Sequence, residues 1–266
     1  MEWRIGIDPG GIRRMISRMP KLPAGTRALL ILNGLFFVVT YVVPDMRNLM
    51  VDWFALFFPL NDQFHIWQFG SSLFMHGSLT HLFFNMFALF SFGVILEALW
   101  GTRKFVAFYF IVGIGAGLIY LGVNYFEFSS VYKELIGLGL KPAEIQALLD
   151  TGSISPRIGS QVADGKLQEF YNHYNAPILG ASGAIYGILV AFGMMFPNAK
   201  LAILFMPVPV AAKFIIPALL LFDLFSGFTG FSLFGGNIGH FAHIGGAIIG
   251  FLLMLYWKPS ARIDND

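Results

Sequence analysis

Residues 180–187 read Gly-Ala-Ser-Gly-Ala-Ile-Tyr-Gly and open an apolar run that continues to Pro197. Hydrophobic packing does not require a serine at the start of such a run. A second segment, residues 239–246, reads Gly-His-Phe-Ala-His-Ile-Gly-Gly and opens another apolar run. The two segments together predict a nucleophile, Ser182, and its general base, His243, held inside a bilayer.

The composition places the chain among membrane proteins. Of its 266 residues, 56% are hydrophobic and only 12% are charged, whereas a soluble domain usually carries about 25% charged residues. The net charge is only +2, which gives no bulk electrostatic reason to expect nucleic acid as a partner. The chain has no cysteine, so disulfides, thiol catalysis and cysteine metal sites are excluded. We expect no cofactor.

Six apolar segments are long enough, or nearly so, to be interpreted as membrane helices. They lie at about 28–43, 74–96, 105–126, 179–196, 211–227 and 240–257. Residues 51–60 are too short to cross and predict a re-entrant or interfacial segment. Residues 127–176 hold six acidic and four basic residues and predict a water-exposed insertion between the third and fourth spans. The predicted fold is an all-α polytopic bundle of six transmembrane helices over residues 28–257.

Positive charge near the span ends predicts the orientation of this bundle. The N-terminal segment, residues 1–27, holds six Lys and Arg residues, and Arg103 and Lys104 follow the second span. The loops on the opposite side hold few Lys or Arg residues or are net acidic. We therefore expect both termini, including the tail 258–266, to be cytoplasmic and the protein to be integral to the cell membrane.

The polar groups of the second, fourth and sixth spans then lie at their outer ends. Ser182 and His243 stand within the first turn or so of their helices and therefore at a similar, shallow depth. Histidine is the side chain suited to taking a serine proton near neutrality. The amide of Asn85 can stabilise a developing oxyanion. His81 shares the helix face of Asn85, because the two are four residues apart.

Glycine spacing predicts that the fourth and sixth spans approach each other closely. Gly183 and Gly187 are four residues apart, as are Gly246 and Gly250. Small residues at this spacing let helix backbones meet. Tyr186 lies one turn below the serine on the same face, where we expect its ring to support the histidine.

These motifs resemble those of the rhomboid family of intramembrane serine proteases. The resemblance rests on Gly180-Ala181-Ser182-Gly183 followed by Tyr186, on Ala242-His243-Ile244-Gly245-Gly246 followed by Gly250, and on His76, His81 and Asn85 in the second span. Glu97 and Gly101 fit the family's turn after that span. In the first loop, Trp67 is followed by Gln68, where family members often carry Trp-Arg.

The resemblance implies a serine endopeptidase that uses a Ser182–His243 dyad and no metal. It implies His81, Asn85 and the Ser182 backbone N–H as the oxyanion site. We assign supporting roles to Tyr186, Gly180, Gly183 and His76. The expected partners are transmembrane proteins, cleaved within a transmembrane segment near the outer leaflet.

Three alternatives stand beside this interpretation. An inactive relative would bind membrane proteins without cutting them, but the intact Ser182, His243 and Asn85 argue against it. A transporter often shows internal repeats and broken helices in both halves, and we see no repeat in this sequence. Histidines at two outer helix ends could form a metal site. Against that site, the chain has no His-Glu-x-x-His motif, and we expect no carboxylate beside the histidines.

Asp223 is an acid within the fifth predicted span, and such an acid is a functional candidate by default. It stands four residues before the end of that span, where we expect its carboxylate to reach outer interface water. We expect Tyr186 to be the better-placed support for His243, and the resemblance also implies a dyad. We therefore predict that Asp223 is not a third member of the site. His76 and His240 are expected to be structural or water-facing.

Overall fold

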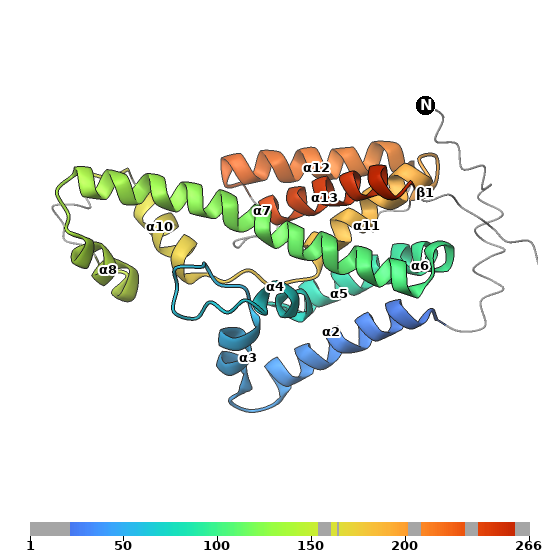
Figure 1. Cartoon of the computed structure of the whole chain (residues 1–266), viewed down its shortest axis with the longest axis horizontal. Helices are drawn as coiled ribbons and strands as arrows, with labels where there is room; N and C mark the ends of the chain where they lie inside the picture. Colours follow the sequence, from blue (N-terminus) through green and yellow to red (C-terminus); the bar gives the residue numbers. More distant parts are fainter. Residues whose placement is uncertain (1–21, 154–160, 164, 202–208, 232–238, 259–266) are drawn as a thin grey trace, which may run out of the picture.

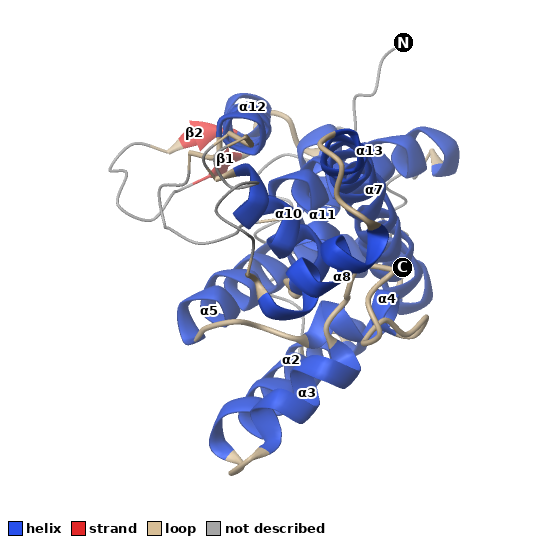
Figure 2. Cartoon of the chain, turned by 90° about the vertical axis from the view of Figure 1, so that its left-hand side faces the viewer, coloured by secondary structure: helices blue, strands red, loops and turns tan. Residues whose placement is uncertain are grey.

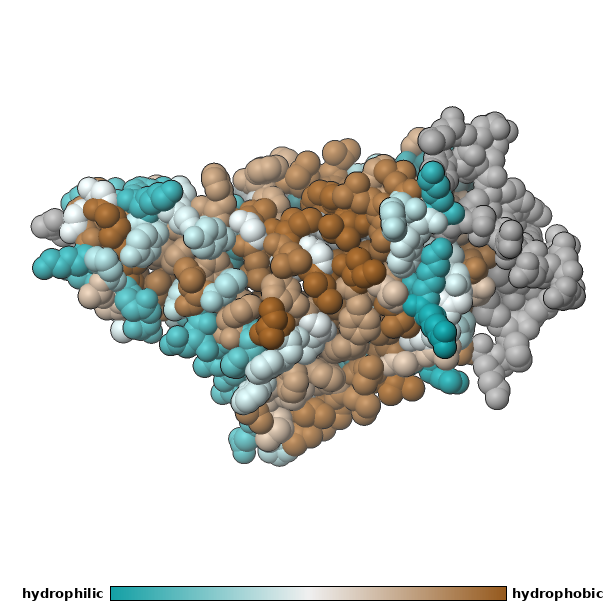
Figure 3. Space-filling model, viewed as in Figure 1, coloured by the Kyte–Doolittle hydropathy of each residue, from teal (hydrophilic) through white to brown (hydrophobic). Residues whose placement is uncertain are grey.

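The protein is an all-α polytopic membrane protein. The computed structural model describes residues 22–153, 161–163, 165–201, 209–231 and 239–258. Within these ranges, the helices long and apolar enough to cross a membrane are Ala24–Val42, Leu79–Trp100, Thr102–Gly137, Ala212–Thr229 and His240–Trp257. A further apolar helix, Ser182–Met195, has 14 residues. Apolar side chains cover the middle of the molecule in Figure 3, and hydrophilic ones gather toward both ends, as expected of a bundle that crosses a bilayer.

Figure 1 shows the order of the elements. The helices are α2 (Ala24–Val42), α3 (Met46–Phe54), α4 (Gln68–Ser71), η1 (Ser72–Phe74), α5 (Leu79–Ala88), η2 (Leu89–Gly93), α6 (Val94–Trp100), α7 (Thr102–Gly137), α8 (Pro142–Thr151), α10 (Lys166–Asn175), α11 (Ser182–Met195), α12 (Ala212–Thr229) and α13 (His240–Trp257). The π-helical turn η2 joins α5 and α6 into one span. Two short strands, β1 (Lys200–Leu201) and β2 (Val210–Ala211), pair antiparallel in the link between α11 and α12.

Helices α7, α11 and α13 form the centre of the bundle, and α12 packs against α13 (Figures 1 and 2). Glycines determine how closely α11 and α13 approach. A Cβ on Gly250 would lie 2.6 Å from the Cα of Gly187, and one on Gly246 would overlap the backbone oxygen of Gly183. The close approach predicted from the glycine spacing is therefore confirmed.

A buried carboxylate in α6 holds the start of α2. Glu97 is 2% exposed, and its oxygens accept hydrogen bonds from Gly25 N at 2.7 Å and Thr26 N at 2.6 Å. The hydroxyls of Thr26 and Thr102 donate to it as well, each at 2.7 Å. An anion at a helix N-terminus is favourable because the helix dipole is positive there. Gly101 follows with a φ of 78°, which glycine adopts without strain, so α6 turns directly into α7.

Gln68 anchors the loop between α3 and α4. The residue is 0% exposed. Its Oε1 accepts hydrogen bonds from Phe57 N at 3.2 Å and His65 N at 3.1 Å. Its Nε2 donates to Asp52 O at 3.0 Å and Gln63 O at 2.7 Å. One neutral amide thus satisfies four backbone groups of the loop, at the position where the family resemblance suggested an arginine.

The third predicted span, 105–126, lies within a longer helix. Helix α7 continues without a break for 36 residues to Gly137. At about 1.5 Å per residue it is about 54 Å long, well beyond the roughly 30 Å of a hydrocarbon core. Phe128, Val131 and Leu135, beyond the predicted end, are buried with residues of α8 and α10 in a second hydrophobic cluster. The insertion is therefore built on an extension of α7.

The insertion returns to the bundle along α10, and both sides of that return are fixed by hydrogen bonds. The Tyr174 hydroxyl donates to Leu60 O at 2.9 Å, and Asn61 Nδ2 donates to Tyr174 O at 2.9 Å. Asn124 Nδ2 of α7 donates to His173 O at 2.9 Å. These bonds hold the end of α10 between α7 and the first loop.

Other expected segments can be placed only in part. Residues 51–60, expected as a re-entrant or interfacial segment, form the end of α3 and the start of the first loop. The basic segment 1–27 lies outside the described residues up to position 21, and the tail lies outside them from 259 onward. Their cytoplasmic position stays a prediction.

Candidate active site

Ser182 is the first residue of α11, and the chain reaches it through a fixed extended segment. Leu56 and Ile178 form an antiparallel bridge with two backbone hydrogen bonds of 2.9 Å. Gly180 N then donates to Ser72 O at 2.9 Å. Gly180 has a φ of 129°, a conformation that favours glycine. These contacts place the serine at the helix N-terminus within four residues of the bridge.

The structure brings Ser182 and His243 together. His243 lies in the first turn of α13, and its Nε2 is 2.9 Å from Ser182 Oγ. The ring of Tyr186 stacks on the imidazole, with centroids 4.3 Å apart and planes at 8°. The close contact between α11 and α13 makes this distance possible, because it brings their first turns side by side. Sequence depth and glycine spacing had predicted the pair and its aromatic support.

His81 and Asn85 approach the site from α5. A Cβ on Gly180 would lie 2.9 Å from His81 Nε2, so the imidazole lies over the turn that delivers Ser182. Asn85 Nδ2 donates to His81 O at 3.0 Å, and an amide nitrogen carries a second N–H. Among the described residues neither side chain is hydrogen-bonded to Ser182. His81 is thus placed beside the turn before Ser182, and Asn85 follows it one turn along α5.

His76 lies behind His81 and is not a surface residue. It is 2% exposed, and the centroids of the two imidazoles are 4.9 Å apart. Burial is the main cause that lowers the pKa of His76 to about 3, and the nearby His81 lowers it further. His76 is therefore neutral near pH 7 and packs against His81 as an uncharged ring.

Asp223 does not reach interface water, so that expectation was wrong. The residue is 4% exposed. Its Oδ1 lies 3.1 Å from His243 Nδ1 and 2.6 Å from His240 Nδ1. Depth along α12 is readable from sequence, but the direction in which the carboxylate points is not, and here it faces α13. The expectation that no carboxylate accompanies the histidines was wrong for the same reason.

Comparison with known proteins identifies the family. The sequence model of the Rhomboid domain matches residues 63–131 and 154–259, more than half of the chain. This chain belongs to the rhomboid family.

Similar rhomboids come from yeast, rat and a bacterium. The protein is 29% identical over 196 residues to Rhomboid protein 1, mitochondrial, of Saccharomyces cerevisiae, a match covering 73% of this chain and 42% of the yeast protein. It is 27% identical over 288 residues to Presenilin-associated rhomboid-like protein, mitochondrial, of Rattus norvegicus, covering 100% of this chain and 61% of the rat protein. Rhomboid protease AarA of Providencia stuartii is 41% identical over 64 residues, covering 24% of this chain and 23% of AarA. This rhomboid therefore spans only 42–61% of the yeast and rat relatives.

Among the described residues of this rhomboid, Asp223, His240 and His243 form a group that could hold a metal ion. Their ligand atoms all lie within 4.8 Å of one another, within the part of the chain that the structure describes. Both Nδ1 atoms lie at hydrogen-bond distance from one and the same carboxylate oxygen. Two ring N–H groups donating to one acceptor explain this arrangement without a metal.

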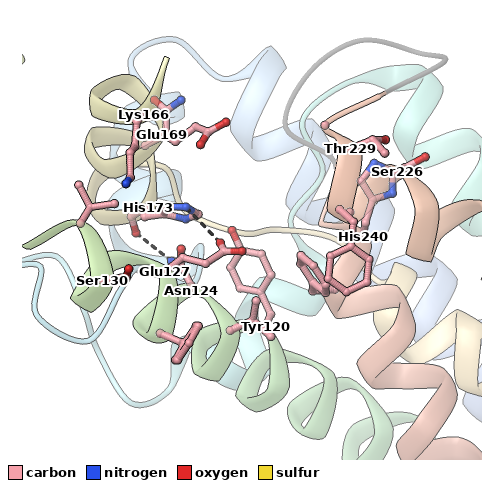
Figure 4. Close-up of a pocket in the computed structure, with 18 residues that line it drawn as sticks. Tyr120, Asn124, Glu127, Ser130, Lys166, Glu169, His173, Ser226, Thr229 and His240 are labelled. Atoms are coloured by element: carbon pink, nitrogen blue, oxygen red, sulfur yellow. Dashed lines mark hydrogen bonds and ion pairs between the residues drawn. The ribbon is translucent and has the colours of Figure 1, made fainter. Parts of the chain in front are cut away.

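A cavity of about 600 Å³ adjoins the site of this rhomboid on the side of the insertion (Figure 4). His240 and Ser226 lie on one wall, and Glu127, Glu169 and His173 lie on the other. His173 Nε2 is 3.2 Å from Glu127 Oε2, and burial lowers the pKa of His173. No local sequence pattern predicts this cavity, because its walls come from four segments that are distant in sequence.

Proposed function

We propose that this rhomboid is an intramembrane serine endopeptidase in which Ser182 is the nucleophile and His243 the general base. The observation that carries the proposal is the distance of 2.9 Å between Ser182 Oγ and His243 Nε2. A serine hydroxyl is a weak nucleophile until an adjacent base takes its proton. Polar groups within membrane helices are costly and tend to be functional, which further supports a catalytic role for the pair.

In the proposed reaction, His243 Nε2 takes the Ser182 proton as Oγ attacks the carbonyl carbon of the scissile peptide bond. The tetrahedral intermediate collapses when the imidazolium gives that proton to the leaving amine. This step releases one fragment and leaves the other as an ester on Ser182. His243 then takes a proton from water, whose oxygen attacks the ester. The bond to Ser182 Oγ breaks, the imidazolium returns the proton to that oxygen, and the second fragment leaves as a carboxylic acid.

The oxyanion of the intermediate would be held at the N-terminus of α11. The backbone N–H of Ser182 belongs to the first turn of that helix, whose N–H groups have no partner within the helix. The positive end of the helix dipole adds a favourable field for an anion. His81 and Asn85 are the proposed side-chain donors from α5, because preorganised donors of this kind stabilise such intermediates.

The proposed substrates are transmembrane proteins cleaved near the outer leaflet. Ser182 is the first residue of α11 and His243 lies in the first turn of α13, so the site lies toward one end of the bundle, where water for the second half of the reaction can enter. In the proposed orientation both termini are cytoplasmic in the cell membrane. A cysteine introduced at Ser153 should then react with an impermeant thiol reagent in intact cells, and labelling only after lysis would invert the orientation. The yeast and rat relatives, however, are named as mitochondrial. Membrane fractionation would distinguish a location in the cell membrane from one in mitochondria.

A fluorophosphonate probe tests the proposal directly, because it reacts covalently with an activated serine. Purified wild-type protein should be labelled, and Ser182→Ala and His243→Ala should not be, although both remain folded. The matched control is Ser226→Ala, which removes a buried hydroxyl outside the proposed pair and should keep full labelling. Labelling that persists in Ser182→Ala would sink the nucleophile assignment. A wild-type protein that binds a transmembrane protein but is neither labelled nor active would instead be a non-catalytic relative.

A further inference from the structure

Asp223 places a carboxylate inside the helix bundle, where burial of the acid alone would not stabilise the fold. A carboxylate taken out of water is costly unless it is paired and hydrogen-bonded. Asp223 is 4% exposed, yet its Oδ1 lies within hydrogen-bond distance of two imidazoles, at 2.6 Å for His240 and 3.1 Å for His243. Both contacts are made by Nδ1 atoms. Two ring donors of α13 thus offset part of the cost of burying the acid.

These contacts determine which nitrogen of His243 carries the proton. An ionised carboxylate only accepts hydrogen bonds, so the nitrogen that faces it must be a donor. In a neutral imidazole one nitrogen is a donor and the other an acceptor. With the proton on Nδ1, the lone pair of Nε2 faces Ser182 Oγ at 2.9 Å. That is the form in which His243 can take a proton from the serine.

We infer that Asp223 is a positioning residue for His243: it fixes the tautomer that can act as a base and stabilises the imidazolium that forms. The inference rests on the proposed function and extends its dyad to a Ser182–His243–Asp223 triad. His240 is a second positioning residue, because its Nδ1–H holds the same carboxylate oxygen in place. The chain thus contributes three helices to the site, α11 with the serine, α13 with both histidines and α12 with the acid.

The groups around His243 leave Asp223 as its only anionic partner among the described residues. Tyr186 covers the face of the imidazole. His240 is 6.3 Å from it, centroid to centroid. Neither tyrosine stacking nor another histidine can stabilise a positive imidazole as a carboxylate does.

The rival explanation is that Asp223 merely ties α12 to α13. A structural tie would affect the free energy of unfolding, but it would leave the chemical step of folded protein unchanged. A positioning residue acts on the transition state, in which His243 is positive. Its loss should therefore lower kcat with little effect on KM. Measurements of kcat and KM on folded enzyme therefore distinguish the two explanations.

The test is to measure kcat and KM of Asp223→Asn on a transmembrane substrate. Asparagine keeps the size but removes the charge and allows a donor to face His243. We expect kcat to fall by more than about 100-fold, against about 10⁴-fold for a comparable change in a soluble triad protease, with KM changed by less than about threefold. His240→Phe should lose about fivefold in kcat, the equivalent of one net hydrogen bond. Ser226→Ala, one turn further along α12, is the matched control and should stay within about twofold of wild type.

A measurement on wild-type protein keeps the inference testable if Asp223→Asn does not fold. Nitrogen-15 NMR of histidine-labelled protein should show His243 as the Nδ1–H tautomer near neutral pH. The Nε2–H tautomer would overturn the inference. So would a folded Asp223→Asn protein that keeps more than about a third of the wild-type kcat, a loss smaller than a single net hydrogen bond would cause. After either of these results, labelling of wild-type protein by the fluorophosphonate would still support the proposed function. A wild-type protein that is neither labelled nor active would refute the proposed function and the inference together.

Discussion

The contact of Glu97 with the start of α2 makes a prediction whose size can be worked out from the structure. We consider Glu97→Gln, which keeps the shape of the side chain. Each carboxylate oxygen accepts one backbone N–H, from Gly25 or Thr26, and one hydroxyl hydrogen, from Thr26 or Thr102. Threonine hydroxyls can rotate and accept instead of donating. A backbone N–H cannot, so whichever oxygen becomes NH₂ loses its backbone partner.

The change should therefore cost one charge-assisted hydrogen bond and leave one buried N–H without an acceptor. A hydrogen bond to a charged group contributes about 1.5–3 kcal/mol, and a buried donor without a partner costs about 1–3 kcal/mol. We add the two contributions and allow for some relaxation of the structure around the new side chain. We therefore expect Glu97→Gln to lower the free energy of unfolding by about 3–5 kcal/mol. Because the site lies at the other end of the bundle, kcat of the folded protein should change little.

Reversible unfolding in mixed detergent micelles measures this loss. The matched control is Glu144→Gln in α8, whose Oε2 accepts Lys141 N at 2.8 Å in an exposed capping box. That change should cost about 0.5–1 kcal/mol, within the usual range for an exposed cap. A loss for Glu97→Gln no larger than that of the control would refute the reasoning, because it would mean that the buried carboxylate adds nothing beyond an ordinary cap.

Further predictions concern the oxyanion site, the helix contact and acid stability. Asn85→Ala should lower kcat by about 10²–10³-fold with little change in KM, and an unchanged kcat with a raised KM would make Asn85 a binding residue. Gly246→Ala should destabilise the fold by at least about 1–3 kcal/mol, because its Cβ would overlap the backbone of α11. The control Gly122→Ala meets nothing within 4 Å and should be neutral or slightly stabilising, so equal losses in chemical unfolding would contradict this explanation. Burial lowers the pKa of His76 from 6.5 to about 3, so the unfolded chain binds a proton that the folded protein does not. Stability should be complete above about pH 6.5 and fall by up to about 5 kcal/mol toward pH 3. Unfolding at pH 4 and pH 7 should show a smaller pH effect in His76→Phe, and an unchanged effect would assign the acid sensitivity to other groups.

The pairing of Ser182 with His243 could be predicted because it depends on depth and spacing alone. Both residues lie in the first turns of their helices, and the glycines that bring α11 and α13 together recur at four-residue intervals. The end of α7 could not be predicted in the same way. Charged residues after position 126 indicate that the chain leaves the lipid, but a helix continues wherever its apolar face finds a partner. Phe128, Val131 and Leu135 find that partner in α8 and α10.

Asp223 and Gln68 show what the sequence could not provide. The depth of Asp223 was readable, but its direction depends on how α12 is rotated against α13. An acid inside a membrane span signals a functional residue, but it does not tell whether the carboxylate faces interface water or a neighbouring helix. In the sequence, Gln68 stands out only as a departure from a family pattern. Its role depends on four backbone groups that the folded loop brings around one amide, and no local pattern reports them.

The contacts that hold the chain between the end of α10 and Ser182 have a practical consequence for imaging the protein. Tyr174, Asn61 and the Leu56–Ile178 bridge hold the chain before it reaches Ser182. A change of length between α8 and α10 is therefore absorbed before it can move the serine. A rigid soluble domain inserted after Ser153 would add mass and a recognisable shape outside the detergent micelle. Such a marker would allow a membrane protein of only 29.5 kDa to be aligned by electron cryomicroscopy with Ser182 undisturbed.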